Sequence, residues 1–150
     1  MNQLNKENSE LFISRLHQLN EIQNPLWGKM NAAEMMQHCR KALDVPLGNL
    51  ELKPNWFFRF FLGKMIKKKV TDDSIYKPSL PTAPEFVTHD KSLIFEEEKG
   101  KLVNTINEFV SISDDLLNQK EHALFGKMTA SEWRISQWKH LDHHWRQFGI

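Results

Sequence analysis

Two histidines, His140 and His144, stand four residues apart in the sequence. On an α-helix this spacing places both imidazoles on one face, one turn apart. A helix that presents two imidazoles in this way offers two nitrogen ligands to one metal ion. The spacing therefore predicts a pair of metal ligands, and the remaining histidines are the first candidates for a third.

His38 is the best candidate for the third ligand, because it falls on an otherwise apolar helix face. The other residues on that face are Met35, Ala42 and Val45. Alone, His38 would be interpreted as a buried histidine that is hydrogen-bonded to a neighbour. Together with His140 and His144 it completes a three-histidine set with an open position, which can activate water or a thiol. We expect these three residues to bind one divalent ion (zinc, nickel or iron), with His143 as an alternative to His140 or His144.

The helix that carries the histidine pair has a core-facing stripe with a polar centre. The stripe comprises Trp133, Gln137, His140, His144, Gln147 and Phe148. Buried polar side chains need hydrogen bonds or a metal, because burial without a partner is costly. Gln147 lies one turn beyond His144, so we expect it to hydrogen-bond a ligating histidine or a bound ligand.

The remaining candidates are assigned to other places. We expect His17 and His89 on the surface and His122 at the rim of the site. Cys39 adjoins His38, but one step along a helix turns it away from the same metal, so it is expected in the core. Asp142 points away from the histidine face and is expected in solvent.

Four segments have the periodicity of helices, and strand alternation is weak. We predict helices over residues 9–23, from Asn31 to about residue 45, over 90–113 and over 130–148. Residues 26–34 and 124–132 match at six of nine positions. Each of these two stretches ends in a capping box, Asn31 with Glu34 and Thr129 with Glu132. The two helices that carry the histidines therefore begin alike, which favours a duplicated helical hairpin.

These segments predict an all-α, four-helix bundle in a single domain over residues 1–150. The third helix follows the second only after a long crossover at about 46–88, which holds five of the six prolines. A short loop would force the two helices to be antiparallel neighbours, and the long crossover removes that constraint.

The crossover contains an aromatic and basic stretch, residues 56–69. Its five aromatic residues lie within six positions: Trp56, Phe57, Phe58, Phe60 and Phe61. One short helix cannot point all of them inward. We expect the stretch to cover one end of the bundle and to contribute to a homodimer interface. Membrane attachment and single-stranded nucleic acid binding are weaker interpretations, because the chain has no second anchor and no matching basic surface.

Composition limits the class of protein. The chain is 40% hydrophobic and 26% charged with a net charge of +1, so no global basic field indicates nucleic acid binding. A single cysteine excludes an internal disulfide and fits a reducing compartment. No apolar run has the length of a membrane span, and the N-terminus lacks the apolar core of a signal peptide. We expect a cytoplasmic protein without stable membrane insertion.

Three motifs together give the chain a family likeness. Trp27-Gly28-Lys29-Met30 is followed by Met35-Met36-Gln37-His38, Phe125-Gly126 precedes Glu132-Trp133, and a His-x-x-His-His-x-x-Gln-Phe-Gly motif runs from His140 to Gly149. In these residues, and over nearly its whole length, the chain resembles the DinB-like (YfiT-like) superfamily, in particular a branch of unknown function. The resemblance implies a four-helix bundle with a metal held by His38, His140 and His144.

Characterised members of that superfamily include thiol S-transferases and a metal-dependent isomerase, so the resemblance implies a metal-dependent enzyme. We expect a site that activates a thiol or water for a small-molecule substrate, which in the transferase case is a low-molecular-weight thiol. No glutamate adjoins a candidate ligand as in common zinc hydrolases, which favours thiol transfer. The alternative is a non-catalytic helical bundle that binds a small molecule or partner and keeps a vestigial metal site.

Overall fold

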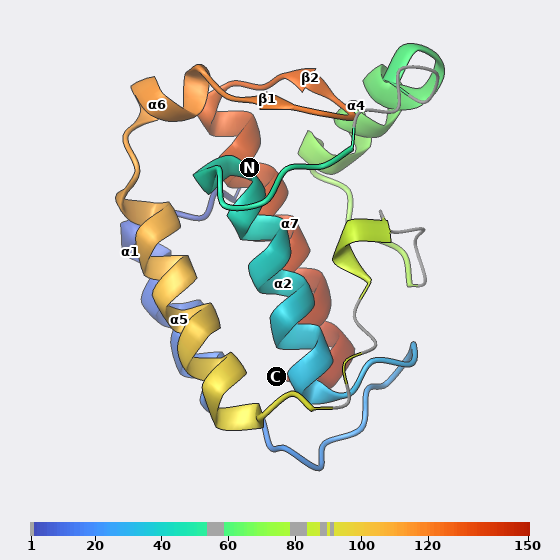
Figure 1. The fold of residues 1–150 in the computed structure, drawn as a ribbon, viewed down its shortest axis with the longest axis vertical. Coiled ribbons are helices and arrows are strands. Elements are labelled where there is room, and N and C mark those ends of the chain that lie inside the picture. Colours follow the sequence, from blue (N-terminus) through green and yellow to red (C-terminus); the bar gives the residue numbers. More distant parts are fainter. Residues whose placement is uncertain (1, 54–58, 79–83, 88–89, 91) are drawn as a thin grey trace.

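The computed structural model describes residues 2–53, 59–78, 84–87, 90 and 92–150. Four long helices lie side by side in it: α1 (Lys6–Leu16), α2 (Ala32–Leu47), α5 (Phe95–Ser111) and α7 (Ala130–Phe148) (Figure 1). Helix α2 packs against both α5 and α7, and α1 packs against the same two helices. The predicted all-α bundle is therefore confirmed.

A long crossover joins α2 to α5, as predicted. It contains a π-helical turn η1 (Arg59–Gly63), helix α4 (Lys64–Thr71) and a 3₁₀ turn η2 (Pro84–Phe86). Helix α4 packs on α7, and η2 packs on α2. The crossover thus places two of its elements against the two helices that carry the candidate ligands.

A short connection follows α5 and leads into α7. It consists of helix α6 (Asp114–Asn118) and an antiparallel hairpin of β1 (Glu121–His122) and β2 (Gly126–Lys127), in which His122 pairs with Gly126. The hairpin lies across one end of the bundle (Figure 1). Strands of two residues show no alternation in a sequence, so this hairpin was not predicted.

The two predicted capping boxes are present. Asn31 Oδ1 accepts a hydrogen bond from the Glu34 amide and Glu34 Oε2 accepts one from the Asn31 amide, both at 2.9 Å. Thr129 and Glu132 make the equivalent bonds at 3.2 and 2.8 Å. These boxes satisfy amides that an N-terminal turn leaves unpaired, so they fix where α2 and α7 begin and which faces their histidines occupy.

The first helix differs from the prediction of residues 9–23. Helix α1 begins earlier because Asn5 and Asn8 form a capping box. It ends at Leu16, and the side chain of Asn20 then accepts a hydrogen bond from the Ile22 amide at 3.1 Å. Such a side-chain turn competes with helix, so the apolar periodicity beyond Leu16 was misleading. Ile22, which lies within the range predicted for this helix, is 83% exposed.

The third long helix begins at Phe95, five residues later than predicted. Asp90 Oδ1 accepts hydrogen bonds from the amide and the hydroxyl of Ser92, and Ile94 has extended backbone. The aspartate therefore caps a turn instead of the helix. Three glutamates in the first turn of α5 complement the helix dipole at the true start.

The second helix keeps a proline in its last turn. Pro46 has no amide hydrogen, so the carbonyl of Ala42 loses its usual partner. Gln137 of α7 supplies one, because its Nε2 donates to that carbonyl at 3.2 Å. A polar side chain of α7 thus supplies the hydrogen bond that Pro46 removes from the last turn of α2.

Within the described part of the chain, we find no helix with both the length and the apolar character that a bilayer span requires.

Candidate metal centre

Three imidazoles meet between α2 and α7. The ring centroids of His38, His140 and His144 are separated by 4.7 to 4.8 Å, so the rings form a nearly equilateral triangle. One ligand nitrogen of each ring lies within 4.8 Å of the others. His38 and His144 are buried and His140 is partly buried. The structure therefore brings together the three residues that the sequence predicted, in a group able to hold a metal ion.

Hydrogen bonds to two of the rings select the nitrogen that faces the group. His38 Nδ1 donates to the carbonyl of Phe86 at 3.1 Å, and His144 Nδ1 donates to Gln147 Oε1 at 2.7 Å. In a neutral imidazole a donor at Nδ1 leaves Nε2 as the lone-pair nitrogen. His38 Nε2 lies 2.9 Å from His140 Nε2. The lone pairs that His38 and His144 offer to a metal are thus those of their Nε2 atoms.

Gln147 makes two hydrogen bonds, one to His144 and one to the backbone, which together fix its position. Besides accepting from His144, it donates from Nε2 to the carbonyl of Trp27 at 2.6 Å. Gly28 has a φ of +86°, and a Cβ at this position would lie 2.6 Å from Gln147 Nε2. Glycine is required there by both the left-handed backbone and the close approach. The predicted hydrogen bond between Gln147 and a candidate ligand is confirmed.

All three rings are held in the neutral form. Burial lowers the pKa of His38, brings that of His144 to about 3, and places that of His140 well below its ordinary value. Neighbouring histidines add repulsion for a proton on His140 and His144. Metals bind the unprotonated imidazole, so the group is in the ligand form at neutral pH.

One nitrogen of the group has no protein partner. His140 Nδ1 is buried without a hydrogen bond among the described residues. Two Nε2 atoms at 2.9 Å require a proton or a cation between them, because two lone pairs at this distance repel. The donor set fits zinc, nickel or iron, since each accepts imidazole ligands.

His143 does not belong to the group of three. Its ring lies 5.0 Å from that of His144 but turns toward Trp27 and Tyr76, at ring distances of 5.7 and 5.9 Å. Burial lowers its pKa. Of the three ligand sets left open by the sequence, the geometry favours the one with His140 and His144.

The other histidines and Cys39 lie elsewhere. His122 stacks on Phe125 at 4.1 Å and also contacts Trp133, so it is part of the packing under the hairpin. His17 is exposed, as predicted, and His89 falls outside the described residues. Cys39 is buried in the core, as expected, and burial raises the pKa of its thiol.

The carboxylates of α2 and α7 all have partners. Glu34 and Glu132 complete the capping boxes, and Asp44 pairs with Arg40 at 3.1 Å. Asp142 was expected in solvent, but it is mostly buried and pairs with Arg146 at 2.8 Å and Arg15 at 3.7 Å. Within these two helices, no acidic side chain is left to act as a general base at the imidazole group.

Sequence reasoning missed the contribution of the crossover. The Phe86 carbonyl orients His38, and the Phe86 ring contacts that histidine edge-on at 5.9 Å. Tyr76 packs against His143. A backbone acceptor carries no residue-type signal, and the crossover has no periodicity that would have placed it. Only the aromatic character of Phe86 and Tyr76 in a Pro-rich segment hinted at packing.

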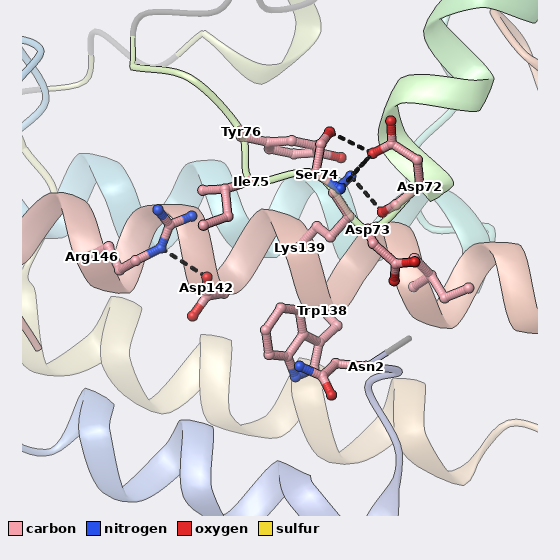
Figure 2. A pocket seen from close by; sticks show the side chains of 11 residues that line it. Asn2, Asp72, Asp73, Ser74, Ile75, Tyr76, Trp138, Lys139, Asp142 and Arg146 are labelled. Carbon is pink, nitrogen blue, oxygen red and sulfur yellow. Dashed lines mark hydrogen bonds and ion pairs between the residues drawn. The ribbon is translucent and has the colours of Figure 1, made fainter.

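A cavity of about 300 Å³ lies beside α7, between the helix and the 72–76 segment. Its lining includes Asp72, Tyr76, Trp138, Lys139 and Arg146. Figure 2 shows Tyr76 over one side of α7 and Trp138 with Asn2 on the other. Lys139 Nζ donates to the Lys69 and Asp72 carbonyls and to Asp72 Oδ1, at 2.7 to 2.9 Å. The lysine therefore ties the crossover to α7.

Comparison with known proteins gives a family and no activity. A family model described as "Protein of unknown function (DUF1569)" matches residues 1–149. No curated protein and no solved structure matches the chain. Since the match extends over all but the last residue, this chain belongs to the DUF1569 family.

Proposed function

We propose that this DUF1569 chain is a metal-dependent enzyme of the DinB-like type, with His38, His140 and His144 as the metal ligands. The observation that carries the proposal is the triangle of neutral imidazoles, with centroid distances of 4.7 to 4.8 Å. Structural zinc sites are closed by four protein ligands, whereas three protein ligands leave a position open. A divalent ion with an open position lowers the pKa of a bound thiol or water and stabilises negative charge.

The residues of the chain have three tasks in such a site. Phe86 and Gln147 hold the rings of His38 and His144 so that their Nε2 atoms face inward. Burial lowers the pKa of the three rings and so keeps them in the neutral form, with one nitrogen lone pair each. The short turn η2 lies on α2 beside His38 and limits the access of water from that side.

Thiol transfer fits the surroundings better than hydrolysis. Hydrolytic sites with one zinc ion commonly use a carboxylate as general base, and the acidic residues of α2 and α7 are all engaged in caps or ion pairs. Attack by a thiol needs no such base once the sulfur is ionised. In the reaction a carbon–sulfur bond forms, the thiol proton passes to solvent, and the leaving group departs with its bonding electrons. We therefore propose a low-molecular-weight thiol and a small electrophile as substrates.

The experiment has two readouts. Purified protein is stripped, reloaded with zinc, nickel or iron, and analysed for bound metal by mass spectrometry. We expect about one ion per chain for the wild type and for His17→Ala, a surface control, and much less for His38→Ala and His140→Ala. Equal metal content in all four proteins would refute the ligand assignment.

Turnover then separates the reaction classes. The loaded protein is assayed with a panel of thiols against an aromatic halide and an epoxide, and separately with activated esters. Metal-dependent loss of thiol that His140→Ala abolishes supports transfer. Metal-dependent ester cleavage without thiol consumption would show that the protein is a hydrolase and not a thiol transferase.

A non-catalytic binding protein is the second candidate, and the cavity beside α7 favours it. Trp138 and Tyr76 provide aromatic walls, and the three aspartates of the lining (Asp72, Asp73 and Asp142) outnumber its two cations (Lys139 and Arg146), a combination suited to a small cationic molecule. Tight ligand binding that persists in metal-free protein, with no turnover across the panel, would establish this function instead.

A further inference from the structure

The crossover exposes large apolar side chains to solvent, whereas a small domain normally buries such side chains in its core. Phe60, Phe61 and Met65 are 78, 60 and 64% exposed. They belong to residues 60–69, named here the aromatic–lysine segment, which comprises most of η1 and the first part of α4. Trp56, Phe57 and Phe58, the other aromatic residues of the predicted stretch, lie outside the described residues. In Figure 1 this green segment projects from the upper right of the bundle. Neighbouring exposed apolar side chains usually mark a contact surface.

Lysines are close to these side chains in the sequence. Residues 60–71 contain four lysines and no aspartate or glutamate, and Lys64, Lys68 and Lys69 are exposed. The net charge of the whole chain is only +1, so the rest of the molecule has net negative charge. The positive charge is thus concentrated where the apolar side chains are exposed.

The orientation of the segment is fixed by contacts with the bundle. Lys67 points inward, where its Nζ pairs with Glu132 Oε1 at 2.9 Å and donates to the Lys127 carbonyl at 2.7 Å. Lys139 bonds the Lys69 carbonyl and Asp72 from the other side. A charged side chain therefore faces the protein, while phenylalanine and methionine face water. This is the reverse of the usual arrangement.

We propose that the aromatic–lysine segment docks this chain on an anionic lipid surface. Phenylalanine and methionine side chains enter the boundary between headgroups and acyl chains, and lysines next to them reach the lipid phosphates. Each lysine near such a surface adds about fivefold in affinity. The negative remainder of the chain is repelled, so the protein docks with the segment foremost.

A second copy of the chain, which the sequence alone favoured over a membrane, is the less favourable occupant once the charges around the exposed side chains are considered. A twofold interface places the same surface patch of each subunit against the other. The aromatic–lysine segment would then meet its own lysines, and like charges across an interface oppose association. An anionic bilayer satisfies the rings and the lysines together.

The test uses the full-length chain and sedimentation with vesicles. One set of vesicles is phosphatidylcholine, and in the other about a third of the lipid is phosphatidylserine. We expect binding to the anionic set only, weakened by added salt. Lys64→Gln with Lys68→Gln should lower the affinity roughly 20- to 30-fold. Phe60→Ser with Phe61→Ser should lower it at least tenfold, by loss of buried apolar area.

Matched control variants make the same chemical changes elsewhere on the surface. Leu11→Ser with Ile22→Ser removes two exposed apolar side chains, and Lys6→Gln with Lys29→Gln removes two exposed charges. Both should bind vesicles within about twofold of the wild type. Circular dichroism verifies that each variant is folded.

Three results would overturn the proposal. The first is no binding to anionic vesicles, and the second is equal losses in the segment variants and the controls. The third is a different occupant. A dimer mass in light scattering that Phe60→Ser with Phe61→Ser abolishes, without vesicle binding, would establish the homodimer interface. Binding of a single-stranded oligonucleotide with the same dependence would establish a nucleic-acid surface.

Discussion

At the scale of the residue, the chemistry of the site follows from the nitrogen atom that each ring presents. The Phe86 carbonyl and Gln147 Oε1 accept hydrogen bonds from the Nδ1–H groups of His38 and His144, which leaves their Nε2 atoms for a metal. The three histidines and Gln147 were predictable because they share helix faces with a known spacing. The Phe86 carbonyl was not, because a backbone oxygen has no residue type and its position depends on the tertiary path of the crossover.

Gln147 is expected to raise metal affinity without touching the metal. Gln147→Leu removes the acceptor for His144 Nδ1 and the bond to the Trp27 carbonyl. Loss of such support typically costs 10- to 100-fold in metal affinity. Competition with a fluorescent chelator measures this change. Gln18→Leu, on the surface, should leave the affinity unchanged, and a similar loss in that control would show a nonspecific effect.

His122 is expected to make stability sensitive to acid. Burial lowers its pKa from 6.5 to about 4, so the unfolded chain takes up a proton first as the pH falls. The contribution of His122 to the free energy of unfolding should therefore decline between about pH 6.5 and 4 and level off below that range. His122→Asn removes up to about 3 kcal/mol of this decline, whereas the exposed His17→Asn does not. Urea titrations at several pH values give the slope of the unfolding free energy against pH for His122→Asn and for His17→Asn. Identical slopes in the two variants would refute the role of His122.

At the scale of the element, α7 was predicted to the residue and α1 was not. The boundaries of α7 are set by a capping box at Thr129 and by Gly149, whose φ of +68° ends the helix, and both signals are local in sequence. The end of α1 is set by a turn around Asn20, which competes with an apolar pattern that continues past it. Capping residues thus predicted the ends of these helices better than apolar periodicity did.

Helices α2 and α7 are expected to be coupled through Pro46. Gln137→Leu leaves the Ala42 carbonyl without its donor. In a Pro46→Ala background the new amide at position 46 can bond this carbonyl, so the same change should cost about 1 kcal/mol less. A double-mutant cycle in urea measures the difference. If Gln137→Leu lowered the free energy of unfolding equally in both backgrounds, Gln137 would not be compensating for the amide hydrogen that Pro46 lacks.

At the scale of the whole molecule, the site is shared by the bundle and its crossover. The bundle supplies the three candidate ligands from α2 and α7, and the crossover supplies Phe86 against His38 and Tyr76 against His143. The bundle was predictable from four apolar faces. The path of the crossover was not, because its contacts with α7 depend on single side chains such as Lys139 and Lys67.

Bound metal is expected to stabilise the whole fold. An ion that binds only the folded chain adds about 2.7 kcal/mol at a hundredfold excess over its Kd. For a domain of 150 residues this corresponds to a rise in Tm of about 5–10 °C. Scanning calorimetry should show the rise in the wild type and in His17→Ala, but not in His38→Ala. An equal rise in all three would place the ion elsewhere.

The separation of the ligands along the chain has a kinetic consequence. His140 and His144 are neighbours on one helix, whereas His38 is 102 residues from His140. Closing so long a loop in an unfolded chain costs about 4 kcal/mol, so an unfolded molecule offers an ion only the local pair. The complete set exists only after α2 has docked on α7. Metal present during refolding should thus leave the folding rate nearly unchanged and lengthen the lifetime of the folded state.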